Sequence, residues 1–492
     1  MTALSELLPA GGAGKVMDFV ASGTLPNGKA VVLKSNGQVE VVAGSGSASN
    51  IPSGSLTTFE AASSNRSQIA FDPNDGSKFV LCYVDVGNGE NGTAIIGTVS
   101  GDTLSFGTPS VFNAGYTVEV SVSFDPATAN QFVAVCSNQS NSSYGTSYVG
   151  TVSSTSISFG SGVVFNSSGT ARINIAFSGA ANTYVIVYKP DSNNGTAVVG
   201  TVSGTSSSFG TPMTFQAGNV GSVSLSADPN DATKLAVASN ISSVGKVAIL
   251  TRSSTSLTVG TAVTFDSTGQ YFANIEYDPI TANRFLLAWS HGAANILKAV
   301  VGSVSSTTIT LGTVLDVHAA HTTGIDVAFD PNNANLAVIS YYNSGAGNPL
   351  MLAQLTLSGT TLTTLTPVVV KSTGTTYPVV GYTSTQSGKI VQAFTDTNNS
   401  SYGTAIVSKT ETLTTNLTAT NFVGIASKAI SNTATGPITL QGGISTNQSS
   451  LTVGSTYYVQ ANGTVSTVST SPAVNIGKAL NATTLKLKGL SV

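Results

Sequence analysis

The stretch GTVSGDTLSFGT, residues 97–108, returns as GTVSSTSISFGS at 150–161 and as GTVSGTSSSFGT at 200–211. Weaker copies begin at residues 250, 302 and 355, so the spacings between starts are 53, 50, 50, 52 and 53 residues. Self-similarity at a fixed period of about 20–50 residues is typical of repeat architectures. We therefore expect a chain built from repeated structural units.

A second marker of the repeat is an Asp-Pro pair that follows two apolar residues. The first unit has Asp72-Pro73, whereas Ser178 and Thr383 replace the aspartate in the third and seventh units. Proline fixes φ and aspartate can bond to the backbone two residues on, so this pair indicates a turn at the end of a strand. The seven anchors are residues 72, 125, 178, 228, 278, 330 and 383.

Each unit contains four segments with the pattern of β-strands. In the first unit they are SQIAF, SKFVLCYVDV, TAIIGTVSG and TLSFGTPSVF. Such runs, bounded by Gly, Pro, Asn and Asp every ~8–12 residues, indicate an all-β fold. Four strands in a unit of roughly 40–50 residues are typical of a β-propeller blade, with a stacked solenoid as the alternative. The quoted stretch then forms the hairpin between the third and fourth strands.

The ends of the repeat array favour a closed ring. Thirteen residues before each later anchor lies an apolar residue of the fourth strand, and the same step back from the first anchor reaches Phe59. This fourth strand has no preceding three, and the seventh unit has three strands without a fourth. The sequence therefore predicts a seven-bladed propeller over residues 53–412, closed by an N-terminal strand. A solenoid would need polar capping repeats, which the sequence does not show.

The terminal segments, 1–52 and 413–492, do not follow the repeat. Turn sequences occur at Pro26-Asn27-Gly28, at Ser35-Asn36-Gly37 and, within STYYVQANGTVSTVS, at Asn462-Gly463. Both ends of a closed ring leave from one blade, so we expect the two segments to form a single small β-rich module.

The overall composition excludes several classes of protein. Of 492 residues, 41% are hydrophobic and only 8% are charged, and the net charge is −3. The apolar content argues against disorder. Because there is no basic block and no long apolar run, we predict no nucleic-acid partner and no membrane insertion. The N-terminus lacks the pattern of a secretory signal peptide.

Cys82 and Cys136 lie 10 and 11 residues after their anchors, on opposite strand faces, so we expect no disulfide.

Groups suited to catalysis or metal binding are sparse. His318 and His321 are three residues apart, which places them on opposite faces of a strand. The loops that begin at Asp85 and Asp191 lack the glutamate that a calcium-binding EF-hand requires. The anchor aspartates recur at turns, which indicates a structural role. We therefore predict no catalytic residues, no metal, no cofactor and no enzymatic activity.

The loops between second and third strands are the best candidates for ligand binding. NSSYGT occurs at 141–146 and again at 399–404, and AWSHGAAN at 288–295 contains the single tryptophan. Aromatic rings flanked by amides and hydroxyls suit sugar ligands. We predict that Tyr144, Tyr402 and Trp289 bind a glycan. The alternative is that both tyrosines cap hairpins and Trp289 packs between blades.

The terminal segments also carry a family resemblance. The run from NFVGIASKAIS through LTVGSTYYVQANGTVSTV to VNIGKALNATTLKLK resembles a C-terminal module of tail-fibre-like structural proteins of phages, notably marine cyanophages. DFVASGTLPNGKAVVLKSNGQV resembles their N-terminal opening. The resemblance implies a protein on the surface of the virion, attached through the terminal module. It also implies other virion proteins as partners and a homo-oligomer, for which we expect a trimer.

Together these observations predict a tail-fibre-like virion protein whose propeller recognises a glycan on the host surface. One alternative is a purely architectural head spike, horn or decoration protein. The second alternative is a glycan-degrading enzyme.

Overall fold

The computed structural model describes residues 15–45, 51–179, 182–292, 296–410, 414–418, 420–460, 463–467 and 474–489. The chain divides into two compact units, Asn50–Thr410 and Met1–Ser49 with Glu411–Val492. The described residues form strands and three single-turn 3₁₀ helices, η2 (Val86–Asn88), η3 (Gln139–Asn141) and η4 (Ser344–Ala346), which confirms the all-β prediction. None of the described helical segments is long and apolar enough to cross a membrane.

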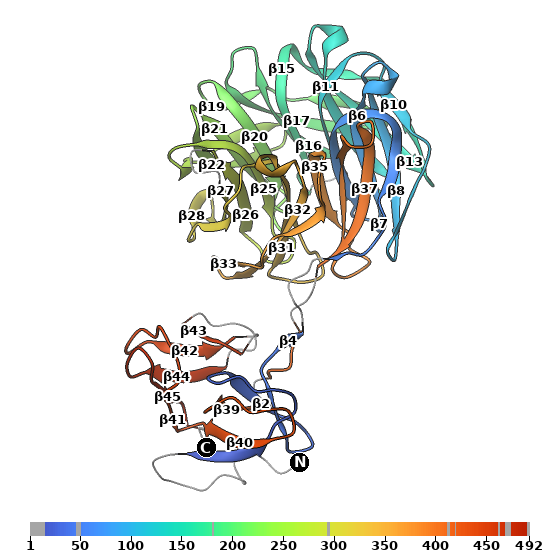
Figure 1. The fold of residues 1–492 in the computed structure, drawn as a ribbon. Helices are drawn as coiled ribbons and strands as arrows, with labels where there is room; N and C mark the ends of the chain where they lie inside the picture. The colour runs from blue at the N-terminus through green and yellow to red at the C-terminus, as the bar shows by residue number, and fades with distance from the viewer. Residues whose placement is uncertain are drawn as a thin grey trace. The chain divides into compact units, whose positions relative to one another are not determined.

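The first repeat forms a four-stranded antiparallel blade (Figure 1). The C-terminal half of β6 (Thr57–Asp72) pairs with β7 (Asp75–Asp85), which pairs with β8 (Asn91–Ser100). The fourth strand consists of two pieces, β9 (Thr103–Phe106) and β10 (Ser110–Asn113), that both pair with β8. The quoted stretch is thus the predicted hairpin between the third and fourth strands.

The other described repeats form equivalent blades, here numbered 1 to 7 in chain order. Two long strands, β6 and β15, each belong to two consecutive blades. Blades 2 and 3 share β15 (Val163–Phe177); blade 2 also has β11 (Thr117–Phe124), β12 (Gln131–Asn138), β13 (Tyr144–Ser153) and β14 (Ser156–Phe159), and blade 3 has β16 (Thr183–Pro190), β17 (Gly195–Ser203), β18 (Ser206–Phe209) and β19 (Met213–Gln216). Blade 4 has β20 (Val220–Ala227), β21 (Lys234–Ile241), β22 (Val244–Ser253), β23 (Ser256–Val259) and β24 (Val263–Asp266), and blade 5 has β25 (Gln270–Tyr277), β26 (Arg284–His291), β27 (Ile296–Ser305), β28 (Thr308–Leu311) and β29 (Leu315–His318). Blade 6 has β30 (Thr322–Phe329), β31 (Leu336–Asn343), β32 (Leu350–Ser358), β33 (Thr361–Thr364) and β34 (Val368–Lys371), and blade 7 has β35 (Thr375–Tyr382), β36 (Lys389–Asp396), β37 (Tyr402–Lys409) and β5 (Ile51–Pro52).

Blade 7 is completed by a strand from the beginning of the propeller. The N-terminal part of β6 pairs with β37, with Thr58 opposite Thr404 and Glu60 opposite Gly403. Phe59 is buried in this seam, with its ring 5.3 Å from the ring of Tyr83. Segments from opposite ends of the repeat array therefore close the ring.

The glycine in the recurring Phe-Gly pair marks a close approach between blades. A Cβ atom on Gly107 would lie 2.0 Å from the carbonyl oxygen of Thr155, in the hairpin turn of the next blade. Gly160 meets Thr205 in the same way, at 1.8 Å. No larger residue fits against the neighbouring backbone at these positions, which explains why this glycine returns with the repeat.

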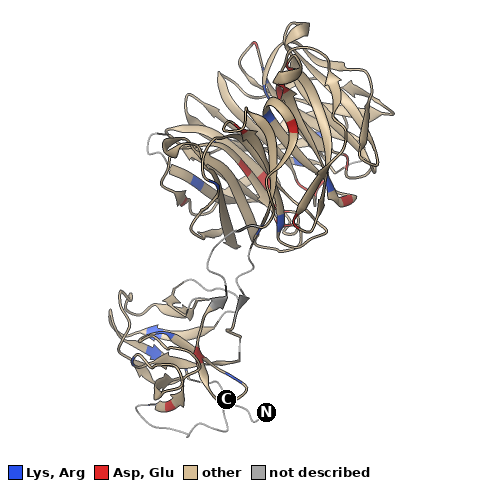
Figure 2. Cartoon of the chain, turned by 45° about the vertical axis from the view of Figure 1, so that its right-hand side comes forward, with Lys and Arg blue, Asp and Glu red and all other residues tan. Residues whose placement is uncertain are grey.

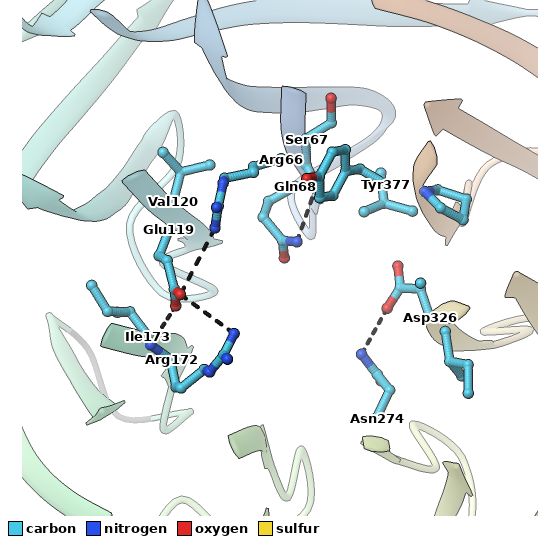
Figure 3. Close-up of a pocket in the computed structure, with 14 residues that line it drawn as sticks. Arg66, Ser67, Gln68, Glu119, Val120, Arg172, Ile173, Asn274, Asp326 and Tyr377 are labelled. Carbon is cyan, nitrogen blue, oxygen red and sulfur yellow. Dashed lines mark hydrogen bonds and ion pairs between the residues drawn. The ribbon is translucent and has the colours of Figure 1, made fainter. Parts of the chain in front are cut away.

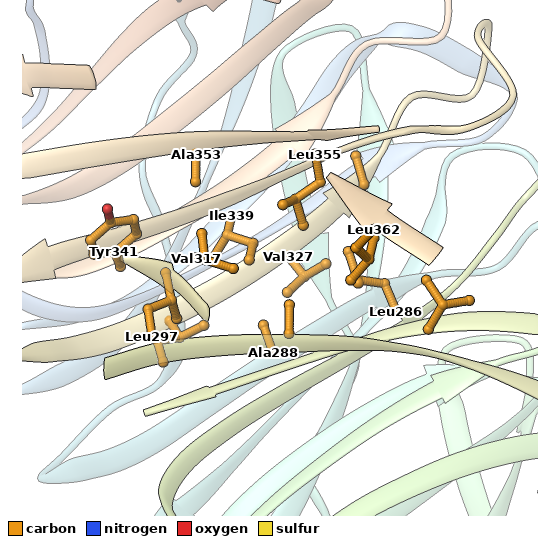
Figure 4. Close-up of a cluster of buried hydrophobic side chains, with 14 of the residues drawn as sticks. Leu286, Ala288, Leu297, Val317, Val327, Ile339, Tyr341, Ala353, Leu355 and Leu362 are labelled. Atoms are coloured by element: carbon orange, nitrogen blue, oxygen red, sulfur yellow. The ribbon is translucent and has the colours of Figure 1, made fainter. Parts of the chain in front are cut away.

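The hydrophobic core lies between adjacent blades. Figure 4 shows the cluster between blades 5 and 6, where Leu286 and Leu297 face Ile339 and Leu355. Cys82 and Cys136 are buried free thiols in the equivalent cluster between blades 1 and 2. Burial raises the pKa of both thiols, and the expectation that they form no disulfide is confirmed.

The second unit combines strands from both ends of the chain. One sheet has the order β1-β40-β39-β2-β3 and another the order β41-β45-β44-β42-β43. The predicted hairpin near residue 463 pairs Val459 with Val465, although Asn462 lies outside the described residues. The strands are β1 (Val16–Val20), β2 (Ala30–Leu33), β3 (Val39–Val41), β4 (Gly44–Ser45), β38 (Thr414–Thr415), β39 (Phe422–Ala426), β40 (Thr435–Leu440), β41 (Ile444–Ser445), β42 (Thr456–Val459), β43 (Val465–Ser466), β44 (Asn475–Ala479) and β45 (Leu485–Leu487).

Candidate ligand-binding site at the mouth of the axial channel

The first strands of the seven blades line a cavity along the axis of the ring. The cavity has a volume of about 600 Å³ and is lined by β6, β11, β15, β20, β25, β30 and β35. One end lies at the Asp-Pro turns, where Pro73, Pro279 and Pro331 contribute to the wall. The opposite end lies where these inner strands begin, and we call it the mouth of the channel.

Polar side chains along the channel bind the free edges of the inner strands. Ser224 Oγ accepts a hydrogen bond from the backbone N–H of Ile275 at 3.1 Å, and Asp326 Oδ2 accepts one from Val380 at 2.8 Å. An inner strand has no neighbour on its axial side, so these N–H groups need side-chain partners. The polar residues of the channel wall therefore also join each blade to the next.

Two carboxyl groups of the channel titrate abnormally. Asp326 lies beside Asn274, whose Nδ2 donates to Asp326 Oδ1 at 2.9 Å, and burial raises the pKa of Asp326 to about 6. Burial also raises the pKa of Glu276 well above its usual range, and the negative charge of Asp326 raises it further. Both carboxyl groups therefore hold a proton more tightly than a carboxyl group in water does.

A smaller cavity of about 230 Å³ forms the mouth itself (Figure 3). On one side, Glu119 Oε1 lies 3.8 Å from Arg66 Nη1 and 3.5 Å from Arg172 Nη1. The backbone N–H of Arg172 also donates to Glu119 Oε2. These three residues come from blades 1, 2 and 3, and Glu119 connects them. Across the cavity lie Asn274 and Asp326.

The backbone around the mouth is strained at equivalent places in the repeat. Arg66, Glu119, Arg172 and Tyr377 lie six residues before their anchors and have φ values of 55°, 54°, 54° and 51°. Such left-handed conformations cost about 1 kcal/mol or more for residues with a Cβ. Gly324, at the same place in blade 6, has φ of 58° without this cost. Each of these residues lies in a β-bulge, a feature that redirects a side chain.

Four exposed aromatic side chains lie at the mouth end of the propeller, on blades 2, 5 and 7. Tyr271 is 55% exposed, and Tyr116, Phe272 and Tyr377 are exposed to a similar degree. Each lies at the start of an inner strand or immediately before it, and Tyr377 lines the mouth cavity. The mouth cavity therefore combines the aromatic face of Tyr377 with guanidinium, amide and carboxyl groups, as sugar-binding sites do.

The structure separates the three residues that the sequence suggested. Tyr144 and Tyr402 are half-buried at the first positions of β13 and β37, at the mouth end but on blades 2 and 7, and neither lines the cavity. Trp289 is only 1% exposed, packs against Phe265, and donates from Nε1 to Asp266 Oδ2 at 2.7 Å. The prediction that Trp289 stacks on a ligand is wrong, because its ring and its N–H group are both used in contacts between blades 4 and 5. This is the alternative in which Trp289 packs between blades.

The two histidines that the sequence placed on opposite faces of a strand, His318 and His321, contact different residues. His318 Nδ1 lies 2.8 Å from the hydroxyl of Tyr341, and His321 contacts Ser344. In the described part of the chain, no three His, Cys, Asp or Glu side chains lie close enough together to hold a metal ion.

The sequence contained one signal for the mouth that the loop-based prediction missed. Arg66, Glu119 and Arg172 are spaced by 53 residues at one position of the repeat, in a chain with only four arginines. Only 8% of the residues in this chain are charged, so a charged residue close to the apolar end of an inner strand is unusual. Alignment of the repeats on their anchors would have shown that these residues share one end of the ring.

Comparison with known proteins supports the fold. No protein-family model matches the sequence, and no curated protein matches it. The BP39L lectin from Burkholderia pseudomallei is similar in structure, with a TM-score of 0.56 and 10% identity over 73% of this chain and 99% of the lectin. The periplasmic gluconolactonase PpgL of Pseudomonas aeruginosa matches with a TM-score of 0.47 and 12% identity, over 73% of this chain and 97% of its own. The likeness to the lectin and the sheet topology identify the fold as a β-propeller.

Proposed function

We propose that the protein is a tail-fibre-like structural component of a phage particle whose propeller binds a glycan on the surface of the host cell. The observation that carries the glycan ligand is the exposed ring of Tyr377 beside guanidinium and amide groups at the mouth of a polar channel. Tyr377 offers a ring face beside the cavity, and Asn274 and Arg66 offer hydrogen-bond donors to sugar hydroxyls. The likeness to a lectin concerns the fold and is compatible with this role.

The path of the chain is consistent with display of the mouth. Ile51 and Pro52, where the chain enters the propeller, pair with Lys409 and Ser408, where it leaves. This point lies at the end of the Asp-Pro turns, since Thr410 bonds to Gly388 in the corresponding turn of blade 7. The mouth is at the opposite end of the propeller. The terminal segments, whose sequence resembles that of phage fibre proteins, therefore do not connect to the propeller near its mouth.

Binding of fluorescently labelled protein to a panel of candidate host and non-host bacteria tests the proposal, with unlabelled protein as competitor. We expect saturable, competed staining that is confined to some strains. Tyr377→Ala should weaken binding about tenfold, equivalent to ~1.4 kcal/mol. Ile280→Ala is the matched control, because Ile280 is exposed at the opposite end, beside an Asp-Pro turn.

Two other outcomes would favour the alternatives. If folded protein stains no strain but remains bound to purified particles, it is an architectural spike, horn or decoration protein. If the protein releases reducing ends from a polysaccharide, and Glu276→Gln abolishes that release, it is a glycan-degrading enzyme.

A further inference from the structure

We infer that the mouth selects saccharides that carry a carboxylate, such as polymers of uronic acids. This inference rests on the proposed function and specifies the ligand class of the same site. Its basis is the pair of guanidinium groups of Arg66 and Arg172, which share one carboxylate.

Both guanidinium groups keep most of their hydrogen-bonding capacity free. The closest approach of a guanidinium nitrogen to Glu119 is 3.8 Å for Arg66 and 3.5 Å for Arg172. Neither contact has the two parallel bonds of 2.7–2.9 Å, roughly, that an arginine forms with a well-matched carboxylate. The two side chains are 38% and 49% exposed, so a ligand can reach them. An incoming carboxylate can therefore form the paired bonds that Glu119 does not make.

The charge at this side of the mouth also favours an anion. Two arginines surround one glutamate, which leaves one positive charge, whereas the whole chain carries −3. Charged residues are sparse over the propeller (Figure 2), so few other groups compete with this positive charge. The carboxyl group of Asp326 lies on the opposite wall and supplies the negative charge there. This polarity orients a sugar acid with its carboxylate toward the arginines.

The cavity offers further partners for the sugar. Ser67 lines the mouth, is 1% exposed, and its hydroxyl has no hydrogen-bond partner among the described residues. A buried hydroxyl without a partner is costly, and a ligand hydroxyl could satisfy it. The Tyr377 ring lies at the same cavity. The arginines would thus select the charge, while Ser67 and Tyr377 contact the rest of the sugar.

The inference is tested by binding of purified full-length protein to immobilised polygalacturonate, its methyl ester, alginate, hyaluronate, dextran and mannan. We expect binding to at least one acidic polymer and at least tenfold weaker binding to methyl-esterified polygalacturonate and to the neutral polymers. Arg66→Gln and Arg172→Gln should each weaken binding to the acidic polymer at least tenfold. Glu119→Gln should strengthen it, because the competing carboxylate is removed; a purely structural role for Glu119 would not produce that gain.

Arg252→Gln serves as the matched control, because Arg252 lies on β22 and bonds to the carbonyls of Ala232 and Ser254, outside the mouth. Melting temperatures of all variants show whether each remains folded. Binding to dextran, mannan or the methyl ester as tight as to the acids would overturn the inference and leave glycan recognition standing. Binding to none of the polymers, together with no staining of any strain, would contradict both proposals. If Arg252→Gln weakens binding as much as Arg66→Gln does, the loss of binding follows from the more negative net charge of the protein and not from the mouth. The inference then fails.

Discussion

The hydroxyl of Thr395 donates a hydrogen bond of 3.0 Å to the carbonyl oxygen of Ser64, a residue 331 positions earlier in the chain. Ser64 in turn donates from its backbone N–H to the carbonyl oxygen of Ser401 at 2.9 Å. Both contacts belong to the seam where β6 completes blade 7. Because every other blade draws its strands from neighbouring sequence, this seam is the place where the ring can open.

Phe59→Ala should destabilise the propeller at this seam. The side chain is buried against Tyr83 and Phe106, and removal of a buried phenylalanine costs about 3–5 kcal/mol. Hydrogen exchange should therefore accelerate in β37 and in the N-terminal half of β6. Deletion of residues 53–62 should have a larger effect and leave the edge of β37 exposed.

Phe112→Ala is the control for the seam, since Phe112 occupies the same repeat position within blade 1 and packs against Tyr148. It should cost a similar free energy of unfolding, with faster exchange confined to its own and the adjacent blade. If Phe59→Ala leaves exchange in β37 unchanged, the seam does not control the opening of the ring.

The protein should be more stable with glycine at position 377 than with alanine. The φ of 51° at Tyr377 suits glycine, whereas any residue with a Cβ is strained there, so Tyr377→Gly should exceed Tyr377→Ala in stability by about 1 kcal/mol. Chemical denaturation of the two variants measures the difference. Phe272 holds the same repeat position in blade 5 without a positive φ, and there the alanine variant should be at least as stable as the glycine variant. The same order of stability at both sites would show that the bulge at Tyr377 is not strained.

Trp289→Phe should lower stability without changing ligand binding. The substitution removes the N–H donor to Asp266, and a buried acceptor that loses a partner costs about 1–3 kcal/mol. His291, whose Nδ1 lies 2.6 Å from the same oxygen, remains as a partner and should keep the cost toward the lower end. Melting curves and cell staining test the two parts separately. Loss of staining by a stable variant would restore Trp289 as a binding residue.

Asp326→Asn should reduce the pH dependence of stability. The pKa of Asp326 is about 6 in the folded protein and about 3.9 in an unfolded chain, so the folded state binds this proton more tightly. Protonation of this group therefore stabilises the fold, and that stabilisation is lost as the pH rises from about 4 through 6, by at most about 3 kcal/mol. Asparagine can still accept the bond from Val380, and a turned Asn274 amide can accept from the new N–H2 group. The variant should therefore be more stable than the wild type at pH 7.5.

Urea denaturation at pH 4.5 and pH 7.5 measures this effect. Asp231→Asn is the control of opposite sign, because hydrogen bonds from Thr233 lower the pKa of Asp231 and its stabilisation is present at the higher pH. Asp231→Asn should therefore weaken the protein at pH 7.5. If Asp326→Asn does the same, the carboxylate of Asp326 is a net stabilising group.

The repeat, the strands and the closing segment could be predicted from the sequence because each depends on local chemistry. Alternation of apolar residues defines strands, and Asp-Pro and Ser-Gly pairs define turns. Phe59 was recognisable because it occupies the fourth-strand position of a repeat that lacks its other strands. These signals lie within one unit of about 50 residues and do not require knowledge of which units touch.

The binding site could not be predicted in the same way, because it depends on contacts between blades. Arg66, Glu119 and Arg172 meet only after the ring has formed and bulges have redirected three inner strands. Trp289 has the local sequence of an exposed loop tip, but the path of β26 places its ring between blades 4 and 5. The propensities of neighbouring residues set strands and turns, whereas exposure and proximity across blades follow from long-range packing, so only the tertiary structure decided where a ligand can bind.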